Sequence, residues 1–230
     1  MGNTGTANPT GILALWNDCR TGQESLYEKW YQGEHLHDRV SIPGFKLGRR
    51  HESVDGAPKY FTYYETESAE VLFSEAYLYQ LDNPSTLTRE VMRGVFINAS
   101  RTACKCIHRV GETRGSHVIT ARSATPVNED NLKTIADHLN STSGCLRSEV
   151  WVRFSPDSNP VDDNPRHEEQ MRGRDSRIEW CMVAHALNGS TAESISRQLQ
   201  QLTYPDPDLE LGTYRFMCEL QHEELGARAD

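Results

Sequence analysis

The sequence lacks the short motifs that identify several large enzyme classes. Its 230 residues contain no G-x-S-x-G, P-loop, G-x-G-x-x-G or H-E-x-x-H pattern, which removes support for a serine nucleophile, nucleotide binding and zinc-protease chemistry. The six cysteines include no C-x-x-C pair and match no zinc spacing, so we expect no metal site. In the absence of a secretory signal, reduced and buried thiols are expected rather than disulfides.

Long apolar runs and basic runs are missing as well. No apolar stretch approaches the roughly 18 residues that span a bilayer, and hydrophobic residues make up 37% of the chain. The net charge is −9 without a Lys/Arg cluster, so neither nucleic acid nor an anionic membrane is an expected partner. Residues 1–112 carry 12 basic and 14 acidic side chains, against 12 and 19 in residues 113–230, which favours the first half as the host of an anion site.

The first ten residues, MGNTGTANPT, have neither the basic nor the apolar part of a signal peptide. They fit the loose M-G-x-x-x-[ST] pattern of N-myristoylation, and a disordered tail explains the same letters. We expect a disordered tail over residues 1–10 and a cytoplasmic protein.

The periodicity of apolar residues changes in the same order in both halves of the chain. In the first half it predicts strands at 11–19, 46–54, 60–66 and 101–111, with helices at 22–40 and 68–81, the latter capped by Ser68. In the second half it predicts strands at 115–125, 144–154, 176–187 and 211–220, with helices at 128–140 and 190–202. A polar, Pro-rich segment at 155–176 joins the two middle strands, and whether it acts as a lid stays open.

Two successive β-α-β-β-α-β units predict an α+β fold of tandem ferredoxin-like modules, at residues 11–112 and 113–230. The boundary is expected near residues 111–116. Each module leaves one sheet face open, and pairing the two sheets face to face covers both.

The first half resembles a known group of proteins. The motifs that carry the resemblance are ALWND, WYQGEH followed by DR, IPGF, GRR, APKYFTYYE, SEAYLYQLDNP and SRTAC, which together cover roughly residues 12–106. In this order and spacing they resemble the dimeric α/β-barrel superfamily and, within it, EthD-like proteins. The resemblance implies a homodimer, two stacked four-stranded sheets with helices outside, and a pocket between sheet and helices for a small organic substrate. It also places His35 on a recurring His, whereas related sequences usually have Pro where this chain has His37.

The stretch EKWYQGEHLHDRV, residues 28–40, concentrates aromatic and titratable side chains in about four helical turns. At 100° per residue, Trp30 and His37 fall on the core-facing stripe. A second stripe at i, i+4 spacing holds Tyr31, His35 and Arg39.

The helical wheel and the resemblance favour different histidines. His35 and His37 are about 200° apart on a regular helix, so one ion or substrate cannot reach both. Gly33 can end or kink the helix and rotate the residues after it, which would bring His35 inward. We favour His35 as the general acid/base, because Glu34 and Tyr31 are close enough in sequence to set its protonation state. A solvated His paired with a nearby carboxylate is the alternative.

The remaining candidates are polar or aromatic residues of the first module. Asp18 or Glu34 is expected to orient the His35 imidazole, with Asp18 as a turn residue the alternative. Residues expected to bind substrate are Trp16, Trp30, His37, Arg39, Arg49, Arg50, Tyr60 and Tyr64. Arg49 and Arg50 leave opposite faces of an extended segment, so one of them can reach a substrate oxyanion while the other is solvated. Surface ion pairs and amphipathic strand packing explain the same arginines and tyrosines.

We therefore predict a cofactor-independent acid–base enzyme of the lyase, isomerase or cyclase type. Its substrate would be a small, enolisable, aromatic metabolite, and no cofactor is expected. Two alternatives stay open: a haem-binding enzyme of the same superfamily with a His as axial ligand, and a non-catalytic binding or scaffolding module.

Overall fold

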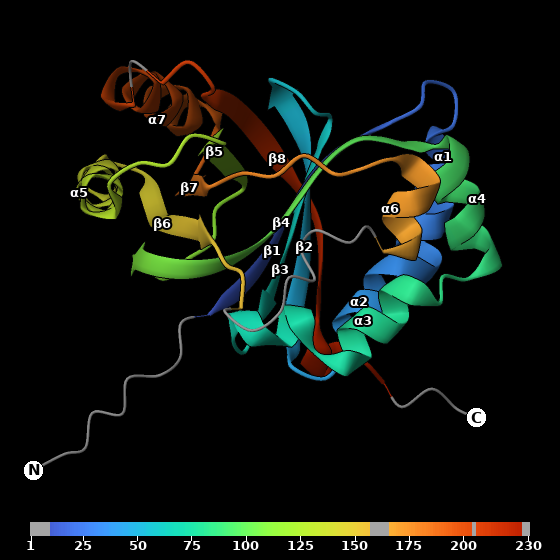
Figure 1. Ribbon diagram of the computed structural model, residues 1–230. Coiled ribbons are helices and arrows are strands. Elements are labelled where there is room, and N and C mark those ends of the chain that lie inside the picture. Colours follow the sequence, from blue (N-terminus) through green and yellow to red (C-terminus); the bar gives the residue numbers. More distant parts are fainter. Residues whose placement is uncertain (1–9, 157–165, 204–205, 227–230) are drawn as a thin grey trace, which may run out of the picture.

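The computed structural model describes residues 10–156, 166–203 and 206–226 (Figure 1). The first module consists of β1 (Gly11–Cys19), α1 (Glu24–Trp30), the π-helical turn η1 (Tyr31–His35), α2 (Leu36–Val40), β2 (Phe45–Asp55), β3 (Tyr60–Thr66), the 3-10 turn η2 (Ala69–Phe73), α3 (Glu75–Asp82), α4 (Thr86–Gly94) and β4 (Phe96–Val110). The second consists of β5 (His117–Ser123), α5 (Glu129–Asn140), β6 (Cys145–Arg153), α6 (His167–Arg172), β7 (Trp180–Ala186), α7 (Gly189–Leu202), β8 (Glu210–Gln221) and the 3-10 turn η4 (His222–Glu224). The predicted α+β fold of two β-α-β-β-α-β units is confirmed.

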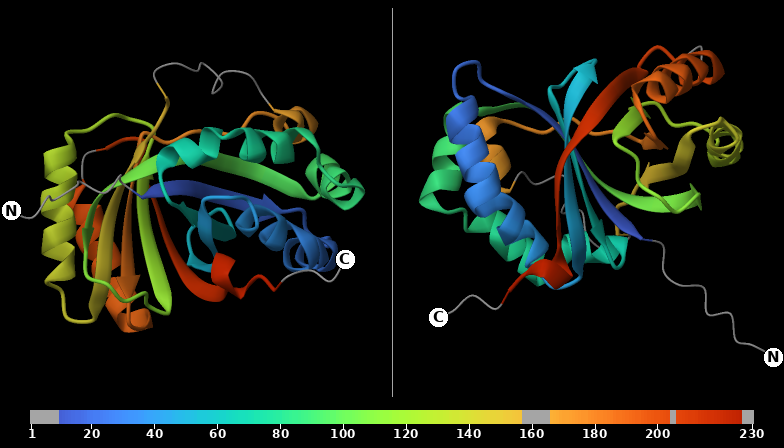
Figure 2. Two further views of the ribbon diagram at one scale, coloured as in Figure 1. Left: turned by 90° about the horizontal axis from the view of Figure 1, so that it is seen from below. Right: turned by 180° about the vertical axis from the view of Figure 1, so that it is seen from behind.

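The eight strands form one closed barrel in the order β1-β3-β2-β8-β5-β7-β6-β4. The two modules join where β2 pairs with β8 and where β4 pairs with β6, both antiparallel. Helices α1 to α4 lie outside the first module's strands, and α5 and α7 lie outside those of the second (Figures 1 and 2). The predicted face-to-face pairing of two sheets is thus completed within a single chain, and closure removes every sheet edge.

Strand alternation divides the apolar residues among three cores. On β1, Ile12, Ala14 and Trp16 point into the barrel, while Leu13 and Leu15 point out toward the helices of the first module. A third core lies between the second module's strands and its helices α5 and α7. The core outside β1 contains Trp30 and Tyr31 of the aromatic helix at 28–40.

One end of the barrel interior carries buried charges. Glu65 and Glu149 are buried, and the Trp151 indole N–H donates to Glu149 at 2.9 Å. The arginines that pair with these two carboxylates are Arg109, Arg114 and Arg147. The Tyr63 hydroxyl and both ring nitrogens of His185 are buried there without a hydrogen-bond partner in the described residues. This end of the barrel is therefore polar, and its two carboxylates are buried while the Arg109 and Arg114 side chains are partly exposed.

Three local predictions for the first module need correction. Ser68 does not cap a helix over 68–81; the segment forms η2, and the Ser74 hydroxyl caps α3 by accepting from the Tyr77 N–H. The first half was predicted to contain two helices, but a further helix, α4, begins at Thr86, where Ser85 provides a second N-cap. β4 begins at Phe96 rather than at residue 101, since it pairs with β1 first and with β6 further on.

Several other expectations concern the ends of the chain and its cysteines. The predicted tail, residues 1–10, lies outside the described residues except for Thr10. Residues 111–116 connect β4 to β5, at the position expected for the module boundary. The six cysteines are free, as predicted. Within the described ranges, no helix has the length and apolar character needed to cross a membrane.

Candidate functional site

The helix that carries His35 contains a π-helical turn. Between α1 and α2, residues Tyr31–His35 form this turn, and the Leu36 N–H donates to the Tyr31 carbonyl five residues back. Five-residue spacing places side chains i and i+5 above one another, whereas a regular helix would separate them by about 140°. The His35 ring therefore packs on Trp30, with ring centroids 4.2 Å apart.

This turn decides which histidine faces inward. His35 is 6% exposed and packs edge-on against the Tyr31 ring at 5.1 Å, whereas the His37 side chain is 29% exposed beside Asp38. The regular wheel, which placed His37 on the buried stripe, was wrong because it assumed an unbroken 100° step. The rotation anticipated at Gly33 is realised by widening one helical turn.

His35 opens onto a small, enclosed cavity between the strands of the first module and its helices. Its lining residues include His35 and Arg39 from the first helical segment, Tyr64 from β3, Tyr77 and Leu81 from α3, Arg101 from β4, and Glu168 and Arg172 from α6. The cavity volume is about 20 Å³, which is room for about one water molecule. The site is thus assembled from both modules and is closed in this structure.

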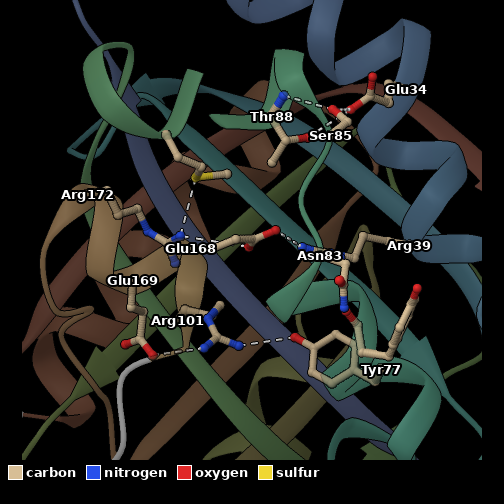
Figure 3. Close-up of polar contacts among 12 residues, drawn as sticks. Glu34, Arg39, Tyr77, Asn83, Ser85, Thr88, Arg101, Glu168, Glu169 and Arg172 are labelled. Atoms are coloured by element: carbon tan, nitrogen blue, oxygen red, sulfur yellow. Dashed lines mark hydrogen bonds and ion pairs between the residues drawn. The ribbon is translucent and has the colours of Figure 1, made fainter. Parts of the chain in front are cut away.

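Helix α6 closes the cavity through ion pairs rather than through an apolar face (Figure 3). The Arg39 guanidinium donates to the Glu168 carboxylate at 2.5 Å, and both side chains are buried. Arg101 donates to the Tyr77 hydroxyl at 3.1 Å and pairs with Glu169 at 3.5 Å. Carboxylates of α6 therefore form ion pairs with the arginines that face the cavity.

The loop after α6 completes this network. Asp175 accepts hydrogen bonds from Arg101 at 2.9 Å and from Arg172 at 2.7 Å, and the Arg172 guanidinium lies over the Phe96 ring at 5.2 Å. The two arginines lower the pKa of Asp175 by favouring its ionised form against the effect of burial. α6 is tied to the first module by charged contacts at several points.

The protonation states of the cavity follow from burial. Burial lowers the pKa of His35 well below its ordinary value, and the guanidinium groups of Arg39, Arg50 and Arg172 lower it further. The imidazole is therefore neutral at pH 7 and has a lone pair to accept a proton. Burial raises the pKa of Tyr64, so its hydroxyl, 3.2 Å from that of Tyr31, stays protonated.

Neither carboxylate expected to orient His35 does so. Asp18 accepts from the Lys59 backbone N–H at 2.6 Å and from the Asn98 side chain at 2.8 Å, at the end of the barrel. Glu34 accepts from the Ser85 and Thr88 hydroxyls and so ties the helix to α4 (Figure 3). The prediction that Asp18 or Glu34 orients His35 was wrong, because the backbone directs both side chains toward other partners.

The predicted substrate-binding residues divide between the cavity and other places. Trp30, Arg39 and Tyr64 lie at or beside His35. The side chains of Trp16, His37, Arg49, Arg50 and Tyr60 are not among those lining the cavity. Three of the predicted residues thus meet at one place, and the other five lie elsewhere.

The two arginines of β2 leave opposite faces, as expected. Arg49 points into the barrel and donates to Glu219 at 2.8 Å, and Arg50 points toward the helices. Arg50 is fully buried, pairs with Glu28 through two hydrogen bonds of 2.9 and 3.0 Å, and lies 3.7 Å over the Tyr31 ring. Neither is solvated, and Arg50 acts on His35 through its charge rather than by lining the cavity.

Trp16 and Tyr60 also have other surroundings. Trp16 stacks on Phe61 inside the barrel at 4.8 Å, so it is not a wall of this cavity. Tyr60 stacks on Tyr27 at 4.9 Å beneath α1. Both are packing residues. The sequence did not predict this, because alternation along a strand does not reveal which face is the barrel interior.

Sequence reasoning missed the residues that α3, β4 and α6 contribute. Tyr77 and Arg101 lie within the family-like motifs SEAYLYQLDNP and SRTAC, so the motifs contained them without indicating a role. Glu168 and Arg172 lie in the polar segment after β6, and nothing in the sequence places that segment against the first module. Residues 157–165 of this segment lie outside the described part of the chain.

The described residues favour no metal or haem at this site. No group of three or more His, Cys, Asp or Glu side chains able to hold a metal ion occurs in the described ranges. His35 is a potential axial ligand for haem, but its ring packs between Trp30 and Tyr31, and the closed cavity of about 20 Å³ has no space for a macrocycle, just as it has none for an organic substrate unless α6 moves. In this arrangement the residues do not fit haem.

Comparison with known proteins establishes the class of fold. The sequence matches no protein-family model and no curated protein. Among solved structures, it is similar to an anthrone oxidase-like protein, with 11% identity, coverage of 96% of this chain and 97% of the other, and a TM-score of 0.56. A candidate monooxygenase from Fusobacterium nucleatum subsp. nucleatum ATCC 25586 shares 9% identity over 93% and 95% of the two chains, with a TM-score of 0.55. One from Lactobacillus acidophilus NCFM shares 8% identity over 94% and 97%, with a TM-score of 0.53.

At these identities the similarity shows the fold alone. The chain has the ferredoxin-like α/β-barrel fold of these proteins along nearly its whole length. The closer relationship to EthD-like proteins, indicated by the motifs of the first module, stays a prediction. Function has to be argued from the cavity itself.

Proposed function

We propose that the cavity is the active site of an acid–base enzyme that needs no cofactor and acts on a small, enolisable aromatic substrate bearing an acidic oxygen. His35 removes a proton from carbon, and Arg39, Arg101 and Tyr64 hold the oxyanion that forms. The observation that carries this proposal is a buried, neutral imidazole facing a cavity that the buried Arg39 and the partly buried Arg101 also line.

The electrostatics of the cavity suit proton abstraction. In the closed structure burial, together with the neighbouring arginines, keeps His35 neutral. The negative charge that develops on the substrate oxygen would favour the imidazolium form of His35 and so assist transfer of the proton to it. Trp30 and Tyr31 enclose the ring and exclude water, which strengthens the interactions of the arginines with a developing enolate.

Substrate can enter only if α6 withdraws, because the closed cavity holds about one water molecule. The acidic group of the substrate would replace Glu168 on Arg39 and Glu169 on Arg101. These exchanges conserve charge pairing, so they avoid leaving a buried arginine unpaired. The Glu168 and Glu169 carboxylates, which pair with these arginines in the closed structure, therefore indicate that the substrate carries an acidic group.

The names of the similar structures are compatible with this substrate class. Anthrone, named in one of them, is an enolisable aromatic ketone, and its oxidation by O2 to anthraquinone and water begins with removal of a carbon-bound proton. Whether the product is an isomerised, cyclised or oxygenated compound depends on which electrophile reacts with the enolate: a proton, a carbonyl carbon of the same molecule or O2. A cytoplasmic location and a homodimer remain part of the proposal, although a second copy is not needed to close the barrel.

The proposed function is tested by proton exchange at carbon. The purified protein is incubated in D2O with phenylpyruvate, which carries a carboxylate, and separately with anthrone, and loss of the enolisable C–H signal is followed by NMR. Exchange faster than in buffer, and saturable with substrate, is the expected result. Background exchange with both compounds would contradict the proposal.

The exchange of carboxylates at Arg39 predicts the effect of a Glu168→Gln substitution. The variant removes the competitor of the substrate, so the KM for phenylpyruvate is expected to fall by about tenfold, which corresponds to about 1.4 kcal/mol. Amide hydrogen exchange of residues 167–172 is expected to become faster, because breaking a buried ion pair is strongly destabilising.

Glu179→Gln is the matched control. Glu179 pairs with Arg153 at 3.0 Å, and both side chains are about one-third exposed. Such a pair contributes little, so KM and exchange of α6 are expected to stay at the wild-type values. An unchanged KM in Glu168→Gln together with faster exchange of α6 would show that the acidic group of the substrate does not bind at Arg39.

A further inference from the structure

A cleft much larger than the His35 cavity lies at one end of the barrel. Its volume is about 580 Å³, within the range typical of small-molecule sites. The ends of β1, β4, β5 and β8 line it, together with residues 57–58 and the loop after α6. Phe96 and Arg172 line both spaces, so these two side chains separate the cleft from the His35 cavity.

The rim of the cleft contains a β-bulge that Asp18 holds. Between Trp16 and Asp18 the pairing of β1 with β4 shifts by one residue, from Ser100 to Ile97. Within this bulge Asn98 has φ 53°, a left-handed conformation that Asn tolerates better than most residues. Its side chain donates to Asp18 at 2.8 Å. The bulge gives the cleft a fixed rim and fully engages the Asp18 carboxylate.

Arg122 is the buried cationic group of the cleft. It is 3% exposed, and its guanidinium lies 4.3 Å over the indole ring of Trp16. Nη2 donates to Glu210 at 2.6 Å, but Nη1 is buried without a hydrogen-bond partner in the described residues. The Glu210 side chain is 59% exposed, so the one carboxylate paired with Arg122 comes from the solvent side. A buried guanidinium thus lines the cleft, and one of its nitrogens has no hydrogen-bond acceptor among the described residues.

Arg122 is the group of the cleft that can recognise an anion. Asp18 accepts from the Lys59 backbone N–H and the Asn98 side chain and keeps its negative charge, and Arg172 is paired with Asp175. The other charges of the cleft are those of Arg122, the exposed Arg174 and the exposed Glu210, so a ligand carboxylate that replaces Glu210 on Arg122 conserves the charge pairing. The apolar part of the wall is formed by Ala57, Pro58, Phe96, Ile97 and Ala99. An organic acid combines the two properties that this wall and this guanidinium require.

We propose that this cleft is a second binding site, which takes a small organic carboxylate with an apolar ring. The carboxylate accepts from the Arg122 guanidinium in place of Glu210, which moves toward solvent, and the ring lies against Pro58 and Phe96. The proposal does not depend on the chemistry of the His35 cavity. A charge-assisted hydrogen bond gives the carboxylate specificity over a neutral group.

Benzoate is the probe, and tryptophan side-chain signals report where it binds. The ¹⁵N-labelled full chain has four Trp indole N–H signals, and that of Trp16 is identified by its loss in Trp16→Phe. Titration with benzoate is expected to shift the Trp16 signal and to leave that of Trp30, which donates to Thr88 at 2.9 Å, in place. A shift of the Trp30 signal alone would place the anion in the His35 cavity and overturn the proposal.

Two substitutions with opposite expected effects make the test independent of folding defects. Arg122→Gln is expected to weaken benzoate binding by at least about tenfold, since a charged donor is lost. Glu210→Gln removes the competing carboxylate and is expected to tighten binding several-fold. Arg215→Gln, which removes an exposed arginine paired with Glu52 elsewhere on β8, is the control and is expected to leave binding unchanged.

Neutral and inorganic probes test the chemical class. Benzamide is expected to bind about tenfold more weakly than benzoate, because it lacks the charge that Arg122 recognises. Inorganic phosphate is expected to bind more weakly than benzoate, because it gains nothing from the apolar wall. Equal binding of benzamide and benzoate, or of phosphate and benzoate, would overturn the proposal, as would wild-type affinity in Arg122→Gln.

Discussion

A His35→Gln variant is expected to exchange the enolisable proton of phenylpyruvate about 100- to 10,000-fold more slowly than the wild type, the range typical of a lost general base. Gln retains hydrogen-bonding capacity but cannot take up a proton at neutral pH. The substrate is expected to bind with similar KM, because Arg39 and Arg101 remain to hold its acidic group. The rate constant and KM are measured by NMR in D2O, and thermal unfolding verifies that the variant is folded.

His37→Gln is the matched control, two residues away on the same helix. Its side chain is 29% exposed and does not line the cavity. Wild-type exchange is therefore expected. The opposite pattern, with His37→Gln inactive and His35→Gln active, would restore the prediction of the regular helical wheel and remove His35 as the base.

The free energy of unfolding is expected to fall by about 4 kcal/mol between pH 7.5 and pH 5.5. The cause is three histidines that are buried and neutral in the folded protein: His35, His51 and His185. Burial, with Arg49 close by, lowers the pKa of His51 to about 3. Burial and the nearby His51, Arg49, Arg147 and Arg114 lower that of His185 well below its ordinary value.

The sign follows from proton uptake on unfolding. Each histidine has a lower pKa in the folded state, so its stabilising contribution is complete above the unfolded pKa of about 6.5 and is lost as the pH falls. Between pH 7.5 and 5.5 each contributes a loss of about 1.4 kcal/mol. Buried Glu149 acts in the opposite direction where it titrates, because burial raises its pKa. Carboxyls with lowered pKa lose their contributions at lower pH.

Urea unfolding at several pH values measures this dependence. A His185→Phe variant is expected to lose about one-third of the pH dependence and to keep its stability at pH 7.5, since neither ring nitrogen of His185 has a hydrogen-bond partner among the described residues. Met182→Leu, a swap of similar volume on the outer face of the same strand, is expected to keep the full pH dependence. A stability that is constant between pH 7.5 and 5.5 would show that these histidines are not buried as neutral rings.

The element order could be predicted because it depends on local periodicity. The runs of aliphatic and aromatic residues over 11–19 and 60–66 match β1 and β3 residue for residue, since such residues favour strands. The second helix of the first module was predicted less well. Two capping serines close together, Ser74 and Ser85, divide this region into α3 and α4, and a hydrophobic pattern alone does not indicate such divisions.

The candidate site was predicted only where its residues share one helix or neighbouring strands. His35, Trp30 and Arg39 were found because they lie close together in sequence. Trp16 and Asp18 were misplaced, because a closed barrel buries both faces of β1 and alternation does not say which face is the interior. The contact of Arg39 with Glu168 joins residues 129 apart, and no local pattern contains it.

The sequence by itself determined the two β-α-β-β-α-β units, the opposite orientations of Arg49 and Arg50, and a polar aromatic helix at 28–40, all of which follow from short-range periodicity and backbone geometry. Only the tertiary structure decided that a π-helical turn brings His35 inward, that α6 closes the cavity with carboxylates, and that Arg122 lines a cleft at the end of the barrel. The physical reason is that these features depend on packing between segments far apart in the chain, where burial and charge pairing outweigh local conformational preference.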